Sequence, residues 1–169
     1  MSKRAKRKVS EASTPAIAQL EAAGIEFATY EYEHSADHME GGYGREAAAK
    51  LGIDPRQVYK TLMADTGDER VIAVVPVSGR LNLKALAAAV GAKKARLADT
   101  RTAQRESGYV VGGISPFGQR NAHRTVLDDG ALHFERILVS GGKRGFDVAL
   151  APADLLNILG ASTAPLAEA

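Results

Sequence analysis

The chain of 169 residues contains no cysteine and no tryptophan. Without cysteine it can form no disulfide and no thiolate metal site, and it has no thiol nucleophile of its own. If a thiol takes part in the chemistry of this protein, that thiol must therefore belong to the substrate.

Long apolar runs are also absent. No segment approaches the roughly 18 consecutive apolar residues that a membrane-spanning helix needs. The first ten residues are basic, but they lack the apolar stretch of a signal peptide. We therefore expect a cytoplasmic protein with no membrane partner. With 45% hydrophobic and 25% charged residues, the composition is typical of one globular domain with a substantial core.

Basic charge is concentrated at the N-terminal end. Five of the 22 lysine and arginine residues lie between positions 3 and 8, which leaves 17 basic against 20 acidic residues elsewhere, a net charge of −3. No second segment of the sequence stands out as densely basic. We expect residues 1–12 to form a disordered basic tail. It is either a solvated terminus without a binding role or an arm that contacts phosphates without reading sequence.

The pattern of caps, alternation and glycine turns predicts a mixture of short helices and strands. Helices are expected over residues 16–23, 45–51, 83–90, 100–106 and 152–160, with Asn82 and Asp99 as the N-caps of the third and fourth. Strands are expected over residues 27–33, 58–65, 70–75, 109–112, 125–127, 135–140 and 146–150, with a loop over 34–42.

Strands that follow one another through tight turns favour antiparallel pairing. We therefore expect an α+β fold, with a mixed or antiparallel, barrel-like β-sheet flanked by short helices. A single domain is expected over residues 13–160, followed by a flexible C-terminal tail over residues 161–169.

Lys60 is a candidate functional residue because it lies in the middle of an expected strand, on the same face as Val58 and Leu62. An ammonium group beside apolar walls is costly unless it is paired, and enzymes use such lysines to hold or polarise an anionic or carbonyl oxygen. The residues alone leave an alternative open. Lys60 could be an edge-strand lysine whose amine extends to water, because the opposite face is also partly apolar.

Two further features could belong to a pocket. The segment 112–118 reads GGISPFG, and its glycines would let backbone amides approach a substrate carbonyl or phosphate, although a tight turn is the simpler alternative. Asp147 lies on the opposite face of its strand from Phe146 and Val148, where it could accept a hydrogen bond from a substrate amine or pair with Lys60.

Other motifs point away from metal, nucleotide or serine-hydrolase chemistry. The segment 140–145 lacks Walker A spacing because position 137 is isoleucine. His34 and His38 are four residues apart, but they fall in an expected loop without a third ligand nearby. No Gly-x-Ser-x-Gly motif is present. We expect no metal ion and no cofactor.

Five segments resemble the YbaK family of Cys-tRNA(Pro) deacylases in their order and approximate spacing. They are VYKTL at 58–62, GRLNLK at 79–84, GAKK at 91–94, GYVVGGISP at 108–116 and VSGGKRG at 139–145. The resemblance covers residues 13–160. It implies an enzyme that clears cysteine from mischarged tRNA(Pro), and it leaves open whether Cys-tRNA(Cys) is also a substrate. It also implies a mixed α/β domain around an antiparallel, barrel-like sheet.

The resemblance also assigns site residues. It implies that Lys60 is the essential residue and that seven others bind substrate. These are Tyr32, Tyr43, Thr61, Gly112, Gly113, Ser140 and Asp147. The chain departs from the family pattern in a longer loop between the two tyrosines, and in tyrosine at position 43 where phenylalanine can occur.

The mechanism that the resemblance implies is substrate-assisted: the cysteine thiol attacks its own ester, while the enzyme binds and orients the substrate. This agrees with a protein that has no cysteine. Expected partners are the aminoacyl end of a mischarged tRNA and prolyl-tRNA synthetase, which would select the tRNA. Two alternatives remain: a deacylase for another amino acid such as alanine, and a non-catalytic module that binds tRNA or the synthetase.

Overall fold

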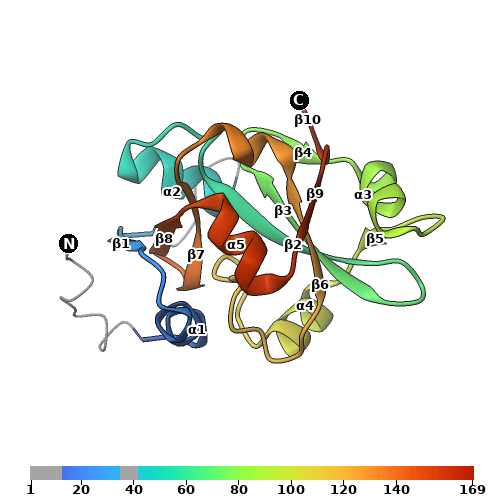
Figure 1. Cartoon of the computed structure of the whole chain (residues 1–169), viewed down its shortest axis with the longest axis horizontal. Coiled ribbons are helices and arrows are strands. Elements are labelled where there is room, and N and C mark those ends of the chain that lie inside the picture. The colour runs from blue at the N-terminus through green and yellow to red at the C-terminus, as the bar shows by residue number, and fades with distance from the viewer. Residues whose placement is uncertain (1–12, 35–41) are drawn as a thin grey trace.

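The computed structural model describes residues 13–34 and 42–169 (Figure 1). The expected basic tail over residues 1–12 and most of the expected loop over 34–42, with His38, lie outside the described residues. Helices and β-sheets are both present, as expected for the α+β class.

A five-stranded mixed sheet forms the centre of the fold, in the order β5-β2-β3-β6-β9. Its strands are β2 (Tyr59–Asp65), β3 (Arg70–Pro76), β5 (Arg96–Leu97), β6 (Arg124–Asp128) and β9 (Ser162–Ala164). The hairpin of β2 and β3 is antiparallel, whereas β6 runs parallel to β3. Strand β3 is the central strand, and every residue from Val71 to Pro76 is buried, which explains its continuous apolar sequence.

Two smaller sheets complete the strands. A three-stranded antiparallel sheet has the order β1-β8-β7. Its strands are β1 (Ala28–Glu31), β7 (Ile137–Lys143) and β8 (Phe146–Leu150). The third sheet pairs β4 (Arg80–Leu81) with β10 (Ala167–Glu168).

The two larger sheets meet at one point, a parallel bridge between Val58 and Leu138. There the Leu138 N–H donates to the Gln57 carbonyl at 3.0 Å. In the described strands, pairing between β2 and β7 stops at this bridge, so the two strands separate beyond it. The sheet therefore wraps in a barrel-like way without closing, and a gap opens between β2 and β7.

Short helices flank the sheets (Figure 1). They are α1 (Pro15–Ala23), α2 (Tyr43–Leu51), α3 (Leu83–Val90), α4 (Thr100–Ser107) and α5 (Pro152–Leu159), with a 3₁₀ helix over Asp129–His133. Side-chain oxygens of Thr14, Asn82 and Asp99 accept from the N–H groups of Ile17, Ala85 and Thr102. The expected caps at Asn82 and Asp99 are therefore confirmed.

Two expectations are wrong. The strand expected over residues 109–112 is a turn, in which the Gly113 N–H donates to the Val110 carbonyl at 2.8 Å. Its glycines let the chain reverse, and the Tyr109 hydroxyl anchors it by donating to the Phe117 carbonyl at 2.6 Å. A turn therefore replaces the strand that alternation alone predicted.

The C-terminal residues 161–169, expected as a flexible tail, form β9 and β10. Leu166 between them is fully buried. The Asp128 carboxylate accepts from the Leu166 and Ala167 N–H groups at 2.8 and 2.9 Å. Because this anchor lies far away in the sequence, local composition could not indicate that the segment is ordered.

Candidate functional site

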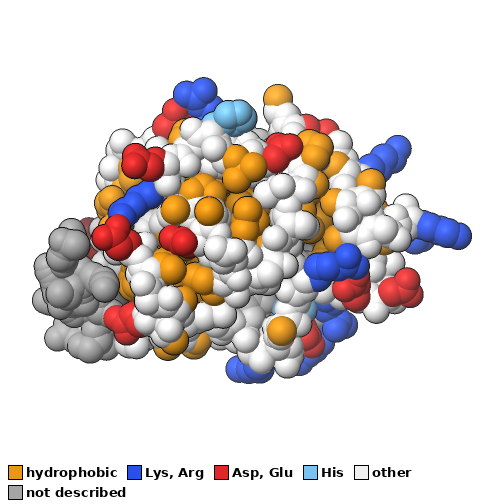
Figure 2. Space-filling model, in the orientation of Figure 1, with side chains coloured by type: hydrophobic (Ala, Val, Ile, Leu, Met, Phe, Trp, Pro, Cys, Tyr) orange, Lys and Arg blue, Asp and Glu red, His pale blue; other side chains and the backbone are white. Residues whose placement is uncertain are grey.

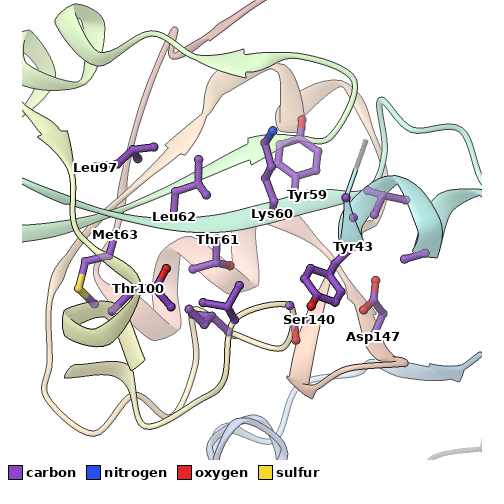
Figure 3. A pocket seen from close by; sticks show the side chains of 18 of the residues that line it. Tyr43, Tyr59, Lys60, Thr61, Leu62, Met63, Leu97, Thr100, Ser140 and Asp147 are labelled. Atoms are coloured by element: carbon purple, nitrogen blue, oxygen red, sulfur yellow. The ribbon is translucent and has the colours of Figure 1, made fainter. Parts of the chain in front are cut away.

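A cavity of about 310 Å³ lies where β2 and β7 separate (Figure 3). Its walls come from the start of α2, from β2, from the segment of β5 and α4, from the turn before residue 115, and from β7 and β8. Seven of the eight residues expected at the site line it: Tyr32, Tyr43, Lys60, Thr61, Gly112, Ser140 and Asp147.

Lys60 and Thr61 are neighbours on β2 and point to opposite sides of the strand, as Figure 3 shows. Both still line the cavity, because β2 has an open edge there. In the described strands β5 pairs only with Ala64 and Asp65, at the far end of β2. The cavity therefore lies along the unpaired edge of β2 and is in contact with both faces of the strand.

Thr61 presents polar groups along this edge. The Met63 carbonyl accepts from the Ala98 N–H at 2.9 Å, on the side of β2 away from β3. Because backbone groups of residues two apart on a strand point the same way, the Thr61 N–H and carbonyl face that side too. The Thr61 hydroxyl oxygen is buried and has no hydrogen-bond partner among the described residues. The strand edge therefore offers donors and an acceptor to a ligand.

Lys60 is half-buried, opposite Val75 on β3. Burial lowers the pKa of its amine, and the positive charge of Arg45 lowers it further. Among the described residues the amine has no hydrogen bond or ion pair. Of the two alternatives considered for Asp147, pairing with Lys60 therefore does not occur. In Figure 3 the two side chains lie apart.

Asp147 lies on β8, paired with Tyr30 on β1 and Ser140 on β7, and its exposed fraction is 6%. Burial raises the pKa of its carboxyl to about 7. Burial also raises the pKa of the Tyr32 hydroxyl, and the negative charge of Asp147 adds to that effect. A cationic amine bound here would favour the carboxylate and lower its pKa.

Ser140 lies opposite Asp147 in the β7–β8 pair, just before a β-bulge. Its hydroxyl oxygen accepts from the Gly142 N–H at 3.1 Å. The Gly141 carbonyl accepts from the Thr14 hydroxyl at 2.6 Å, which ties the bulge to the start of α1. Ser140 is thus held by the turn and has no histidine beside it among the described residues of the cavity to activate it as a nucleophile.

Tyr43, the first residue of α2, and Gly112 form a close contact. A Cβ atom at Gly112, which has φ of +93°, would lie 2.7 Å from the Tyr43 ring. The Arg144 guanidinium lies 4.9 Å from the centroid of this ring, and its Nε donates to the Val111 carbonyl at 2.8 Å. The Tyr43 ring is therefore fixed in the cavity wall.

Gly113 is the one expected site residue that does not line the cavity. A Cβ atom there would lie 2.7 Å from the Lys143 Cα atom and 2.8 Å from the Arg144 backbone nitrogen. Its role is to let the turn pack against the β7–β8 hairpin. Gly112 therefore lines the cavity, whereas Gly113 supports its wall from behind.

The apolar part of the cavity could not be found from sequence motifs. This part is lined by Leu62, Met63, Leu97, Ala98, Ala103, Val111 and Ile114, with Thr100 among them. Such residues are common in any core, so no motif marks them. Only the packing of β5 and α4 against the open edge of β2 brings them to the site.

In the described part of the chain, no group of three or more histidine, cysteine, aspartate or glutamate side chains is arranged to hold a metal ion. None of the described helices is long and apolar enough to cross a membrane. The site thus consists of an amine, a carboxyl, hydroxyls and backbone amides around an apolar hollow.

Comparison with known proteins relates this site to a family. The aminoacyl-tRNA editing domain family matches residues 43–158. The chain is 34% identical over 155 residues to EbsC of Enterococcus faecalis, a proposed Cys-tRNA(Pro)/Cys-tRNA(Cys) deacylase, covering 90% of this chain and 92% of EbsC. It is 32% identical over 126 residues to a proline–tRNA ligase of Desulforamulus reducens, covering 74% of this chain and 22% of the ligase.

A solved structure described as a proposed trans-editing enzyme for prolyl-tRNA synthetase has the same fold. Its TM-score is 0.74 at 23% identity, covering 92% of this chain and 99% of that one. The family match spans the cavity from Tyr43 to beyond Asp147, and the α+β fold agrees with it. The chain therefore belongs to the YbaK family of aminoacyl-tRNA editing domains.

Proposed function

We propose that the protein is a cytoplasmic trans-editing deacylase that removes cysteine from mischarged Cys-tRNA(Pro), with Cys-tRNA(Cys) as a second substrate. The similarity to EbsC along nearly the whole chain supports this assignment. So does the similarity to part of a proline–tRNA ligase, which relates the domain to proline charging.

One observation carries the proposal: the described residues of the cavity supply groups of opposite charge but no thiol. Lys60 lies on one side of it and Asp147 on the other, and neither is paired with a described residue. None of the described lining residues is a cysteine or a histidine. Such a cavity suits a substrate with its own cation, carbonyl oxygen and nucleophile, and an aminoacyl ester of cysteine has all three.

The proposed reaction uses the thiol of the substrate. The cysteine sulfur bonds to the ester carbonyl carbon, the bond from that carbon to the ribose 3′-oxygen breaks, and the thiol proton ends on the leaving oxygen. The tRNA departs with a free hydroxyl and the amino acid as a strained thiolactone, which water opens. A thiol with an ordinary pKa near 8.5 is partly ionised at neutral pH, so orientation is the main requirement.

Each polar residue then has a role. Asp147 binds the α-ammonium group of the aminoacyl ester. Lys60 stabilises the negative charge that develops on the carbonyl oxygen, and a lowered pKa makes it a better proton donor to the leaving oxygen. The Thr61 edge and the amides near Gly112 hold the ester in the attack geometry, and the fixed Tyr43 ring limits its movement.

Selection of tRNA(Pro) would come from prolyl-tRNA synthetase as a partner, because the cavity is large enough for the aminoacyl end alone. Addition of the synthetase is expected to increase turnover of Cys-tRNA(Pro) more than that of Cys-tRNA(Cys). Equal stimulation of both substrates, or none, would remove the synthetase from the proposal.

The test compares Cys-tRNA(Pro), Cys-tRNA(Cys), Ser-tRNA(Pro) and Ala-tRNA(Pro) as substrates. Serine replaces the thiol by a hydroxyl of nearly the same size. It therefore separates the effect of the thiol's reactivity from the effect of how well the side chain fits the cavity. We expect rapid loss of the two cysteinyl esters and little loss of the others. The thiolactone would be detected by adding a second thiol, whose sulfur attacks the thiolactone carbonyl and forms a stable adduct before water opens the ring.

A second candidate is hydrolysis of a thiol-free ester such as Ala-tRNA(Pro). The pKa of about 7 at Asp147 favours it, because a carboxyl with that pKa could accept a proton from an attacking water near neutral pH. Turnover of Ala-tRNA(Pro) that increases with pH through 7 would support it. No turnover of any ester would instead favour a binding module.

A further inference from the structure

Five exposed cations surround the β5 and α4 wall of the cavity. They are Lys93, Lys94, Arg96, Arg101 and Arg105, which we call the cationic strip. Asp99 is the one acidic residue between positions 91 and 105. This density contrasts with the net charge of −3 that the chain has outside residues 3–8, and the expectation that residues 3–8 are the one densely basic segment is wrong.

Most of the positive charge of the cationic strip is not neutralised. In the described residues its one ion pair joins the Arg105 Nε atom to Glu106 at 3.9 Å, a weak contact. Asp99 is occupied as the N-cap of α4, where it accepts from the Thr102 N–H at 2.7 Å. Arg96 stands opposite Asp65 in the β2–β5 pair. Asp99 also attracts Arg105 and Arg101 without an ion-pair contact. Lys93 and Lys94 have no ion pair with a described residue.

The cationic strip belongs to the same segment as part of the cavity wall. Leu97, Ala98, Thr100 and Ala103 line the cavity, and cations precede, separate and follow them along the chain. Arg101 and Arg105 are four residues apart on α4 and so lie on one face of the helix, on the side away from Ala103. Figure 2 shows Lys and Arg side chains at the margins of the molecule where Figure 1 places β5 and α4, with some acidic ones nearby.

Leu97 adds an apolar surface at the same place. It lines the cavity, yet 53% of it is exposed, which is unusual for a leucine on a strand. A mouth that combines an exposed leucine with adjacent cations fits a ligand with an apolar ring face and a negatively charged backbone, which is the chemistry of single-stranded nucleic acid.

We infer that the cationic strip binds the phosphates of the single-stranded 3′ end of the tRNA, with Leu97 against its terminal nucleoside. This rests on the proposed function, since an aminoacyl group inside the cavity forces its ribose and the preceding phosphates to lie at the mouth. Phosphate contacts of this kind add affinity and orientation without reading sequence, which leaves the choice of tRNA to a partner.

Two pairs of substitutions test the inference: Lys93→Gln with Lys94→Gln, and Arg101→Gln with Arg105→Gln. Arg80→Gln with Lys84→Gln is the matched control, because these exposed cations lie on β4 and at the start of α3 and the net charge changes equally. Binding of deacylated tRNA is measured over a range of salt concentrations. Deacylation is measured with Cys-tRNA(Pro) and with the 3′-cysteinyl ester of adenosine, which has no phosphate.

Each strip pair is expected to weaken tRNA binding roughly tenfold at low salt. The slope of the logarithm of affinity against the logarithm of salt concentration should become shallower by about 0.7 for each phosphate that the variant no longer binds. KM should increase for Cys-tRNA(Pro) and stay unchanged for the adenosine ester.

Unchanged tRNA binding in both strip variants, or an equally large decrease in the control pair, would overturn the inference. If the wild type cleaves neither ester while tRNA binding still depends on the strip, the proposed function fails and the binding surface stands.

Discussion

The polar and apolar walls of the cavity differ in what they contribute to the fold. Lys60, Thr61 and Asp147 place an amine, a hydroxyl and a carboxyl where burial is unfavourable, and none has a compensating partner among the described residues. Met63 and Ala103, on the apolar side, belong to the main hydrophobic core and stabilise the protein by their burial. The polar wall is thus maintained at a cost to stability, and the apolar wall is not.

This difference gives a criterion for assigning roles. Replacing a residue of the polar wall by an uncharged or apolar one should reduce activity while stability is kept or increased. Replacing a residue of the apolar wall should reduce stability and change the size of the amino acid that is accepted. Substitutions at four positions, taken from the largest expected effect to the smallest, could each contradict this division.

The largest effect is expected for Lys60→Ala. Loss of the group that stabilises the developing oxyanion should reduce kcat/KM for Cys-tRNA(Pro) at least about 10²-fold, while the melting temperature stays close to that of the wild type. Lys84→Ala, at an exposed position of α3, is the control. Full activity of Lys60→Ala would show that the polar wall does not carry the chemistry.

Asp147→Asn should change stability in a pH-dependent way. Because burial raises the pKa of Asp147 to about 7, the folded protein retains a proton that the unfolded chain releases near pH 4. The resulting stability is fully present below the unfolded pKa and is lost as the pH rises through 7. At pH 8 the substitution should therefore increase the free energy of unfolding, by on the order of 3 kcal/mol, and much less at pH 4.5.

Urea unfolding at the two pH values measures this effect, with Asp68→Asn in the exposed β2–β3 turn as the control. Deacylation by Asp147→Asn should decrease because the ligand for the α-ammonium group is lost. A variant that is less stable than the wild type at pH 8 would mean that Asp147 has a favourable partner in the folded protein.

Met63→Ala tests the apolar wall. Met63 has an exposed fraction of 4%, so its truncation should reduce the free energy of unfolding by about 2–3 kcal/mol. It should also enlarge the cavity and increase hydrolysis of esters of larger amino acids relative to cysteine. Val74→Ala, in the same core but away from the cavity, should reduce stability without altering this preference. Equal preferences in both variants would remove Met63 from the determinants of specificity.

Thr61→Val should give the smallest effect, with opposite signs for stability and activity. Removal of a buried hydroxyl without a partner among the described residues should stabilise the protein by about 1 kcal/mol, and loss of the contact to substrate should increase KM severalfold. Thr61→Ser keeps the hydroxyl and should keep the KM of the wild type. Thermal unfolding measures the change in stability, and steady-state kinetics measure the change in KM. Destabilisation by Thr61→Val would indicate that the hydroxyl has a hydrogen-bond partner inside the protein.

Much of the fold could be predicted from the sequence where the signals are local. Asn82 and Asp99 cap α3 and α4 as expected, because a side-chain oxygen at this position satisfies nearby N–H groups. The β2–β3 hairpin follows from its alternation and turn residues. The C-terminal segment could not be predicted, since Leu166 is buried through hydrogen bonds to Asp128, which is distant in sequence.

The site also has features that the sequence could predict and features that it could not. Seven of the eight residues that the family resemblance assigned to the site line the cavity. The family motifs could not show that Lys60 and Asp147 stay unpaired on separate sides, because that depends on where β2 and β7 separate. The five cations of the cationic strip lie within 13 consecutive residues, so their density is visible in the sequence. Only the fold shows that this segment also forms part of the cavity wall.

Composition and local pattern were enough to establish the absence of a protein thiol, the short capped helices, the central hairpin and the family motifs with Lys60. These properties depend on residue content or on neighbours a few positions apart. The open edge at Thr61, the burial of Asp147 and the apolar wall became visible only in the folded chain. Each depends on contacts between segments that are far apart in the sequence, and burial and pairing at those contacts set both the charge state and the shape of the cavity.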